Sequence, residues 1–399
     1  MVVFRAGKKG LNIGYYFLYV VIVLPFLLPF YFTQIEIIDI MNGLLMYMSI
    51  FLMAVTYVLH YKTIRRPFAL FFLMYYILLL STIINNGDIG GSLKHCIKIL
   101  LLCLLVGTVV DDEKRTDTFL HAVRDITLVF FVFHCITMIV YPNGIPKFSS
   151  LSTFPLFVYG SVNSTIRAIF PGMCCSSILD IREKKLSVAT LIFFFGQFYC
   201  FFAIYHTSTT LIAICFILCC YLFKKVMSRN IRKIYFISII GVFVLQITII
   251  ILSNVNFIEF IADLFQKSSD FSGRTLLWDN TLLSILANPI IGRGQQTTDV
   301  IVREIGNVNG AHNYYLDLTY QRGILGLLVF FVIIVQPFKL IKKESKVSDT
   351  VFILVVYCCA CLIMFLSEPF FEYEYNVLPI FYALLLTQEK DNHTVLSGA

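Results

Sequence analysis

The sequence has few charged residues for its length. Only 14% of its 399 residues are charged, whereas a soluble domain carries about a quarter. Hydrophobic residues make up 58% of the chain, and the mean hydropathy is +0.83. This composition excludes a soluble enzyme.

Other features are also absent. All 12 cysteines fall in apolar segments, so we expect no disulfide framework. There is no phosphate-binding P-loop, no cluster of metal ligands, no transporter-like repeat and no low-complexity tract. The sequence therefore predicts neither a cofactor nor a bound metal. The basic N-terminus resembles a signal sequence, but no small-x-small cleavage site follows it, so we expect a retained first helix.

The apolar residues form blocks of about 20, which is the length that crosses ~30 Å of hydrocarbon. The blocks lack the strict alternation of barrel strands, so they indicate helices. We predict an all-α polytopic membrane protein with about twelve transmembrane helices. The expected spans are 11–32, 38–59, 67–85, 92–110, 120–141, 165–181, 187–204, 208–223, 234–252, 318–337, 350–367 and 376–387.

The charge distribution orients these spans. With the N-terminus inside, most of the 31 basic residues fall in cytoplasmic segments, so the positive-inside rule places both termini in the cytoplasm. The net charge of +7 then reflects topology and requires no nucleic acid. We expect helices one to nine over 1–252, a large extracytoplasmic loop over 253–317, and helices ten to twelve with a cytoplasmic tail over 318–399. A loop this long in a compact protein is usually functional.

The large loop contains several polar motifs. Residues 272–289 read as an amphipathic helix with a serine cap and a proline stop, and one face carries Arg274, Trp278, Thr281 and Ile285. Arg293 follows between two glycines, in a turn that would let the backbone approach a ligand closely. His312 and Asn313 then lead into the tenth span, near a helix N-terminus.

These motifs, in this order, resemble the bacterial O-antigen polymerase and O-antigen ligase superfamily (the Wzy and WaaL type). The resemblance covers roughly 160–330, while the first 150 residues match only as apolar spans. One departure concerns His206 to Thr210, where the family often has Ser-Arg and this chain has no arginine. The residues that carry the resemblance are Gly273, Arg274, Trp278, Pro289, Gly292, Gly294, His312, Asn313, Tyr315, Leu316, Gly323 and Gly326.

The resemblance implies about twelve transmembrane helices in a bacterial inner membrane, an outward active site, and a donor glycan on undecaprenyl diphosphate. It also implies that Arg274 and His312 occupy essential positions. Their chemistry fits, because a departing diphosphate needs fixed positive charge, and arginine grips phosphate with two donors. The incoming hydroxyl must lose a proton, so we predict His312 as the general base of one inverting, metal-independent displacement.

Further residues are candidates for substrate binding. Arg167 lies just inside the sixth span, where an arginine is expensive and normally faces a cavity or a partner, so we expect it to bind the diphosphate. Lys94 and Lys98 lie one turn apart in the fourth span, where snorkelling to headgroups is an equal alternative. Arg293 either binds substrate or fills a turn. The motif residues Asn313, Trp278 and Tyr315 complete the set, with packing as the alternative for the two aromatics.

We therefore predict a membrane glycosyltransferase that polymerises undecaprenyl-diphosphate-linked repeat units of O-antigen or capsular polysaccharide. The first alternative is an O-antigen ligase that transfers finished polymer to lipid A-core. The second is a lipid-linked oligosaccharide flippase, although transporters tend to place ionisable residues at the midplane in repeated halves. The expected partners are the lipid-linked glycan, membrane lipid and a protein that regulates chain length. The sequence identifies neither the sugar nor the linkage.

Overall fold

The computed structural model describes residues 12–60, 64–146, 155–160, 162–203, 208–251, 274–341 and 347–397. The basic residues before the first span, the first part of the large loop through Gly273, and His206 with Thr207 lie outside the described residues.

The described chain is helical apart from turns, connecting loops and one β-bridge between Phe157 and Gly160. Two short 3-10 helices are η2 (Ser228–Asn230) and η3 (Phe371–Tyr373). The α-helices are α1 (Ile13–Leu27), α2 (Phe30–Thr33), α3 (Glu36–His60), α4 (Arg66–Ile84), α5 (Ile89–Val110), α6 (Glu113–Val140), α7 (Val162–Glu183), α8 (Val188–Ala203), α9 (Ser208–Leu222), α10 (Lys224–Met227), α11 (Ile231–Ile251), α13 (Arg274–Ala287), α14 (Thr298–Ile305), α15 (Tyr314–Leu340), α16 (Asp349–Met364) and α17 (Glu374–Ser397).

Among the described residues, six helical stretches are long and apolar enough to cross a membrane: α3, α4, α5, α6, Lys224–Thr248 and α15. Helices α1, α8, α9 and α16 are apolar but shorter. Each predicted span overlaps a helix, so the all-helical architecture is confirmed. The number of spans and their orientation stay predictions.

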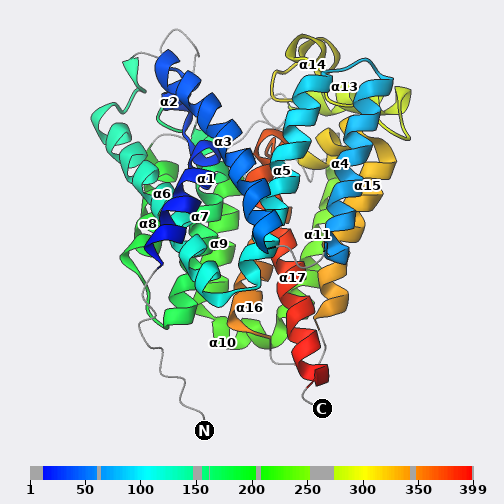
Figure 1. The fold of residues 1–399 in the computed structure, drawn as a ribbon. Coiled ribbons are helices and arrows are strands. Elements are labelled where there is room, and N and C mark those ends of the chain that lie inside the picture. The colour runs from blue at the N-terminus through cyan, green and yellow to red at the C-terminus, as the bar shows by residue number, and fades with distance from the viewer. Residues whose placement is uncertain are drawn as a thin grey trace.

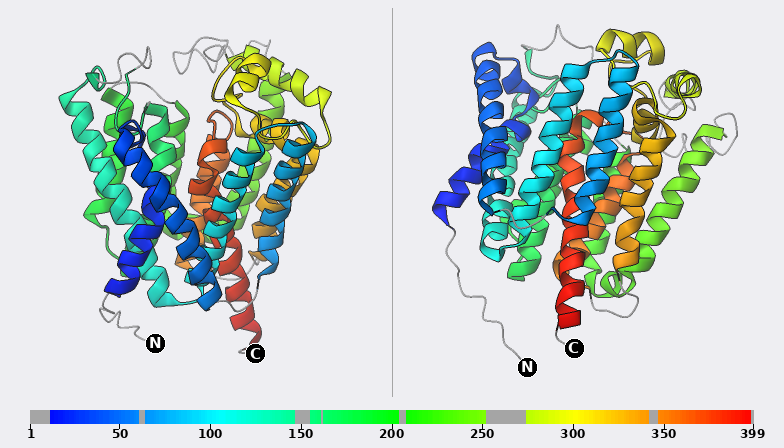
Figure 2. Two further views of the ribbon diagram at one scale, coloured as in Figure 1. Left: turned by 45° about the horizontal axis from the view of Figure 1, so that its top comes forward. Right: turned by 45° about the vertical axis from the view of Figure 1, so that its right-hand side comes forward.

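The helices lie side by side in one bundle (Figure 1). Helices α13 and α14 lie at one end, and the start of α1 and the end of α17 lie at the other, as Figure 2 also shows. Helix α16 is apolar on nearly every side because α7, α9, α11 and α17 pack around it. Both ends of the described chain thus lie opposite α13 and α14.

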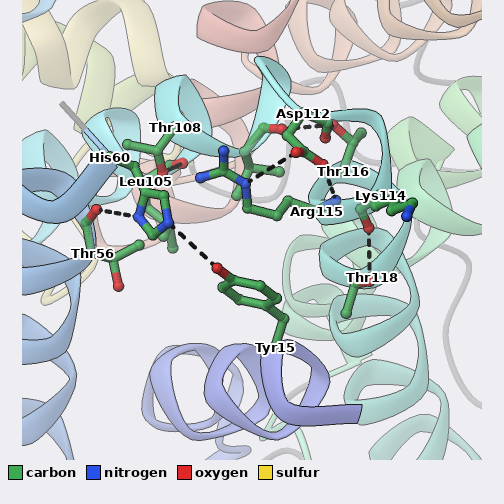
Figure 3. A network of polar contacts seen from close by, with 11 residues as sticks. Tyr15, Thr56, His60, Leu105, Thr108, Asp112, Lys114, Arg115, Thr116 and Thr118 are labelled. Atoms are coloured by element: carbon green, nitrogen blue, oxygen red, sulfur yellow. Dashed lines mark hydrogen bonds and ion pairs between the residues drawn. The ribbon is translucent and has the colours of Figure 1, made fainter. Parts of the chain in front are cut away.

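At the end of the bundle away from α13, one set of polar contacts links α1 to α3, and a neighbouring set lies at the α5–α6 junction (Figure 3). The Nδ1–H of His60 donates to the Thr56 carbonyl at 2.9 Å, and Tyr15 Oη lies 3.4 Å from His60 Nε2. Asp112 caps α6 by accepting from the backbone N–H of Arg115 at 2.9 Å. The Tyr15–His60 contact thus ties α1 to α3, and the cap fixes the start of α6.

Helix α15 is broken at Gly323, where φ is +61° and ψ is −167°. A loop inserts at the break: the N–H groups of Arg293 and Gly294 donate to the carbonyls of Tyr320 and Gln321 at 2.7 and 2.9 Å. A Cβ at position 323 would lie 2.2 Å from the Ile290 carbonyl oxygen, so only glycine fits. The predicted tenth span over 318–337 thus lies in α15, which is long and apolar enough to cross a membrane but is interrupted at this residue.

The glycines beside Arg293 serve the same packing. A Cβ on Gly292 would lie 2.5 Å from the Gly323 nitrogen, and one on Gly294 would lie 2.3 Å from the Thr82 Cα on α4. The sequence predicted that this turn brings backbone close to a ligand. The structure shows instead that it brings backbone close to α15 and α4, because the inserted loop replaces helical hydrogen bonds.

Candidate active site

Helix α13 forms as predicted and buries the predicted face. Trp278 is 3% exposed, and its indole N–H donates to the Ala311 carbonyl at 3.0 Å. Trp278 packs with Ala311 and Leu316, and Leu282 and Ile285 cover the cluster. This anchor places Arg274, the first residue of α13, beside the residues that precede α15.

Asn313 caps the N-terminus of α15, and the sequence analysis had placed it near a helix N-terminus without identifying it as the cap. Its side-chain oxygen accepts from the N–H groups of Tyr315 and Leu316 at 3.1 and 3.2 Å. Its amide donates to the Leu366 carbonyl at 3.1 Å and to Gln246 on α11 at 2.9 Å. These bonds give Asn313 a structural role that the prediction of substrate binding did not include.

Backbone carbonyls at the end of α16 and in the connection to α17 accept hydrogen bonds from Tyr314, Arg274 and Arg167. The N–H of Tyr314 donates to the carbonyl of Phe365 at 2.9 Å. The Arg274 guanidinium donates to the Ser367 carbonyl at 2.6 Å, and Arg167 on α7 donates to the Pro369 carbonyl at 2.7 Å. Two arginines from distant parts of the sequence thus hold carbonyls two residues apart, and the structure brings together two predicted binding residues.

Arg167 is held rigidly. It is 8% exposed, donates from Nη2 to Ser164 Oγ at 2.9 Å, and stacks its guanidinium 4.6 Å from the Tyr373 ring centroid. Its Nε is buried and has no hydrogen-bond partner among the described residues. A buried arginine with an unused donor is suited to bind an incoming anion.

The charges of both arginines influence the protonation of His312. Burial, together with the charges of Arg274 and Arg167, lowers the pKa of His312 to about 3. Its backbone lies in the left-handed region at φ +51°, and its Nδ1 is buried without a partner among the described residues. Burial also lowers the pKa of Arg274, and Arg167 adds to the effect, while Glu368 opposes it. His312 is therefore a neutral imidazole in a positive field.

A polar cavity of about 520 Å³ lies next to this cluster. Lys94, His95 and Lys98 of α5 line it, together with Arg167 and with Asp317 of α15. Three of the predicted substrate-binding residues thus share one cavity. His312 and Arg274 do not line it, although Arg167 connects the two regions. We call it the outer cavity, because the topology predicted from the sequence places this end of the bundle on the outer side of the membrane.

Beneath the outer cavity lies a buried charged cluster that the sequence analysis did not identify. Glu374 of α17 accepts from Arg322 Nη2 and His95 Nε2, both at 2.9 Å. It also accepts from the hydroxyls of Tyr75 and Tyr314 at 2.6 Å each. The side chains of Arg322 and Glu374 are 0% exposed. The sequence did contain a signal for this cluster, because Arg322 lies inside an expected span and Glu374 lies at the edge of another. An ionisable residue in such a position is a functional candidate by default.

The other predicted residues are occupied by protein contacts. Arg293 forms an ion pair with Glu304, which also accepts from the Tyr320 hydroxyl at 2.7 Å. The Glu304 hydrogen bond raises the pKa of Arg293. Tyr315 Oη donates to the Leu362 carbonyl at 3.1 Å and packs near Phe330 and Phe365. Arg293 and Tyr315 do not line the outer cavity.

A second cavity, of about 430 Å³, is mainly apolar and lies between α1, α5, α6, α7, α16 and α17. Tyr375 lines both this cavity and the outer cavity. A polar chamber and an apolar one therefore meet at one side chain. Together they suit a ligand with a charged head and an apolar chain.

Comparison with known proteins gives a partial match. No curated protein and no solved structure matches this chain. Residues 191–331 match the family model described as O-antigen ligase. The matched segment contains Arg274 and His312, whereas Arg167, His95 and Glu374 lie outside it. The match confirms the resemblance to the O-antigen ligase and polymerase superfamily that the motifs of residues 273–326 predicted.

Proposed function

We propose that this chain is a multi-pass membrane glycosyltransferase that joins repeat units carried on undecaprenyl diphosphate. The growing glycan leaves its diphosphate carrier and passes to the nonreducing end of a new unit. The observation that carries the proposal is that Arg167 and Arg274 both donate to carbonyls of the α16–α17 connection. The charges of both arginines also act on His312. The O-antigen ligase match supports the same class of enzyme.

Diphosphate chemistry accounts for the arginines. Breaking the anomeric C–O bond releases an anion, so fixed positive charge at the leaving group lowers the barrier. Arg167, which is buried, and Arg274, which is partly buried, provide this charge where water screens it less than at the surface. The proposal needs no metal ion, because two arginines can neutralise a diphosphate as a divalent ion would.

The cavities support a lipid-linked substrate. The outer cavity, with Lys94, Lys98 and Arg167, suits an anionic head and its sugars. The apolar cavity that shares Tyr375 suits part of an isoprenoid chain. The neutral imidazole of His312 has the protonation state that the sequence-based proposal of a general base requires.

An O-antigen ligase is the second candidate, and the description of the matching family favours it. The two enzymes share donor chemistry and differ in their acceptor. We would reconstitute the purified chain in liposomes with lipid-linked repeat units, with and without lipid A-core. Elongated lipid-linked glycan without lipid A-core supports the polymerase. Product on lipid A-core alone contradicts the polymerase and supports the ligase.

A further inference from the structure

The glycosyl transfer needs a proton acceptor, and the outer cavity has a histidine that the sequence analysis did not weigh. His95 lies in the second turn of α5, and its side chain is 12% exposed. It lines the outer cavity with Lys94, Lys98 and Arg167. It therefore lies among the residues that the proposed function gives to substrate binding.

The hydrogen bonds of His95 fix its tautomer. Glu374 is a buried carboxylate beside the Arg322 guanidinium, and it can only accept from His95 Nε2 at 2.9 Å. The N–H of a neutral imidazole is then on Nε2, and the lone pair is on Nδ1. Nδ1 has no hydrogen-bond partner among the described residues. The Phe371 ring lies 4.7 Å from the imidazole centroid and restricts its rotation.

This is the arrangement by which a carboxylate orients a histidine base. His312 has no such support, since its Nδ1 is buried without a partner among the described residues. His95 also lines the outer cavity, where the proposed function places the substrate, whereas His312 does not line it.

We propose that His95 is the general base of the transfer, positioned by Glu374. This inference rests on the proposed function and revises its assignment of the proton. The acceptor hydroxyl gives its proton to His95 Nδ1, and its oxygen forms the bond to the anomeric carbon. The bond from that carbon to the diphosphate oxygen breaks, and the electron pair leaves with the diphosphate.

Several charged and titratable groups surround His95 and would influence its pH response. They are Lys94 and Lys98 on its own helix, Tyr75 on α4, Arg167 on α7, Tyr314, Asp317 and Arg322 on α15, Glu372 on η3 and Glu374 on α17.

The test compares His95→Asn and His95→Ala with the wild-type chain in liposomes, with lipid-linked repeat units and lipid A-core both offered as acceptors. His60→Asn is the matched control, because His60 is also partly buried and hydrogen-bonded but lies at the opposite end of the bundle. We expect kcat to fall by about 100-fold or more in both His95 variants, with little change in KM. His60→Asn should keep its activity.

Two further readouts separate a base from a structural residue. Free imidazole should restore part of the activity of His95→Ala and none of that of His312→Ala. The fall of kcat/KM at low pH, which is the acidic limb of its pH profile, should disappear in His95→Asn. His95→Asn within fivefold of wild type, or loss of activity without imidazole rescue and with the acidic limb retained, would overturn the proposal.

The two proposals fail in different ways. Transfer to lipid A-core alone contradicts the polymerase proposal. The role of His95 can still be tested in that case, by measuring the activity of the His95 variants with lipid A-core as the acceptor. Wild-type polymerisation with active His95 variants contradicts only the role of His95. Transfer to neither acceptor by the wild-type protein would overturn both.

Discussion

The buried pair of Arg322 and Glu374 should hold α15, α17, α4 and α5 together. Both side chains are 0% exposed, and Glu374 accepts four hydrogen bonds. Glu374→Gln leaves a buried guanidinium without its counter-charge, which costs about 3–5 kcal/mol of unfolding free energy. Arg322→Met leaves the carboxylate without its cation and should cost a similar amount.

The size of the thermal effect follows from chain length. An unfolding entropy of about 2.1 cal/mol/K per residue over 399 residues gives roughly 0.8 kcal/mol/K. The single variants should therefore melt about 4–6 °C below the wild type in detergent. The double variant should melt above at least one single variant, because it removes both unpaired charges.

The matched control is the ion pair Lys224–Asp349, whose N–O distance is 2.8 Å and whose side chains are 33% and 50% exposed. Lys224→Met should change the unfolding free energy by less than about 1 kcal/mol, because solvent screens that pair. Melting would be followed by the loss of monodisperse protein on size-exclusion chromatography after heating. Additive effects of Arg322→Met and Glu374→Gln, or effects no larger than that of the control, would refute the argument.

Four other predictions concern the site and the topology. His312→Ala and Arg274→Lys should each reduce transfer about 100-fold or more at equal protein level, since lysine keeps the charge but lacks the two-donor fork; near-normal polymer from either variant would remove that residue from the mechanism. Excess EDTA should leave the rate almost unchanged, and restoration of a chelated enzyme by magnesium or manganese would contradict the arginine account. Because the folded pKa of His312 is about 3 and lies below the ordinary value near 6.5, its contribution to stability is complete above pH 6.5 and is lost as the pH falls toward 3; the melting temperature of His312→Gln should thus fall less than that of the wild type between pH 7 and 4.5. In a cysteine-free background, an impermeant thiol reagent should label a cysteine at Val308 in intact spheroplasts and not one at Ser228, and the reverse pattern would invert the topology.

The sequence alone determined the helical membrane architecture. Long apolar blocks leave the backbone no alternative to helices in lipid, so each predicted span overlaps a helix of the bundle. It also located α13 and placed Asn313 near the N-terminus of the next helix, because helix periodicity, capping residues and proline stops act over a few residues. The motifs that contain Arg274 and His312 could likewise be recognised from the sequence, since each is local in the chain. The family model matches the segment that contains them.

Only the tertiary structure decided which distant residues meet. Arg167 and Arg274 are about a hundred positions apart, and no local pattern predicts that both donate to the α16–α17 connection. The partnership of His95 with Glu374 joins α5 to α17, and the pairing of Arg293 with Glu304 joins the inserted loop to α14. The break at Gly323 depends on a loop that inserts from 289–294, and a periodicity argument cannot detect it. Such contacts depend on which helix faces pack together, and that choice is made by the whole bundle because a helix surface can pack in several ways.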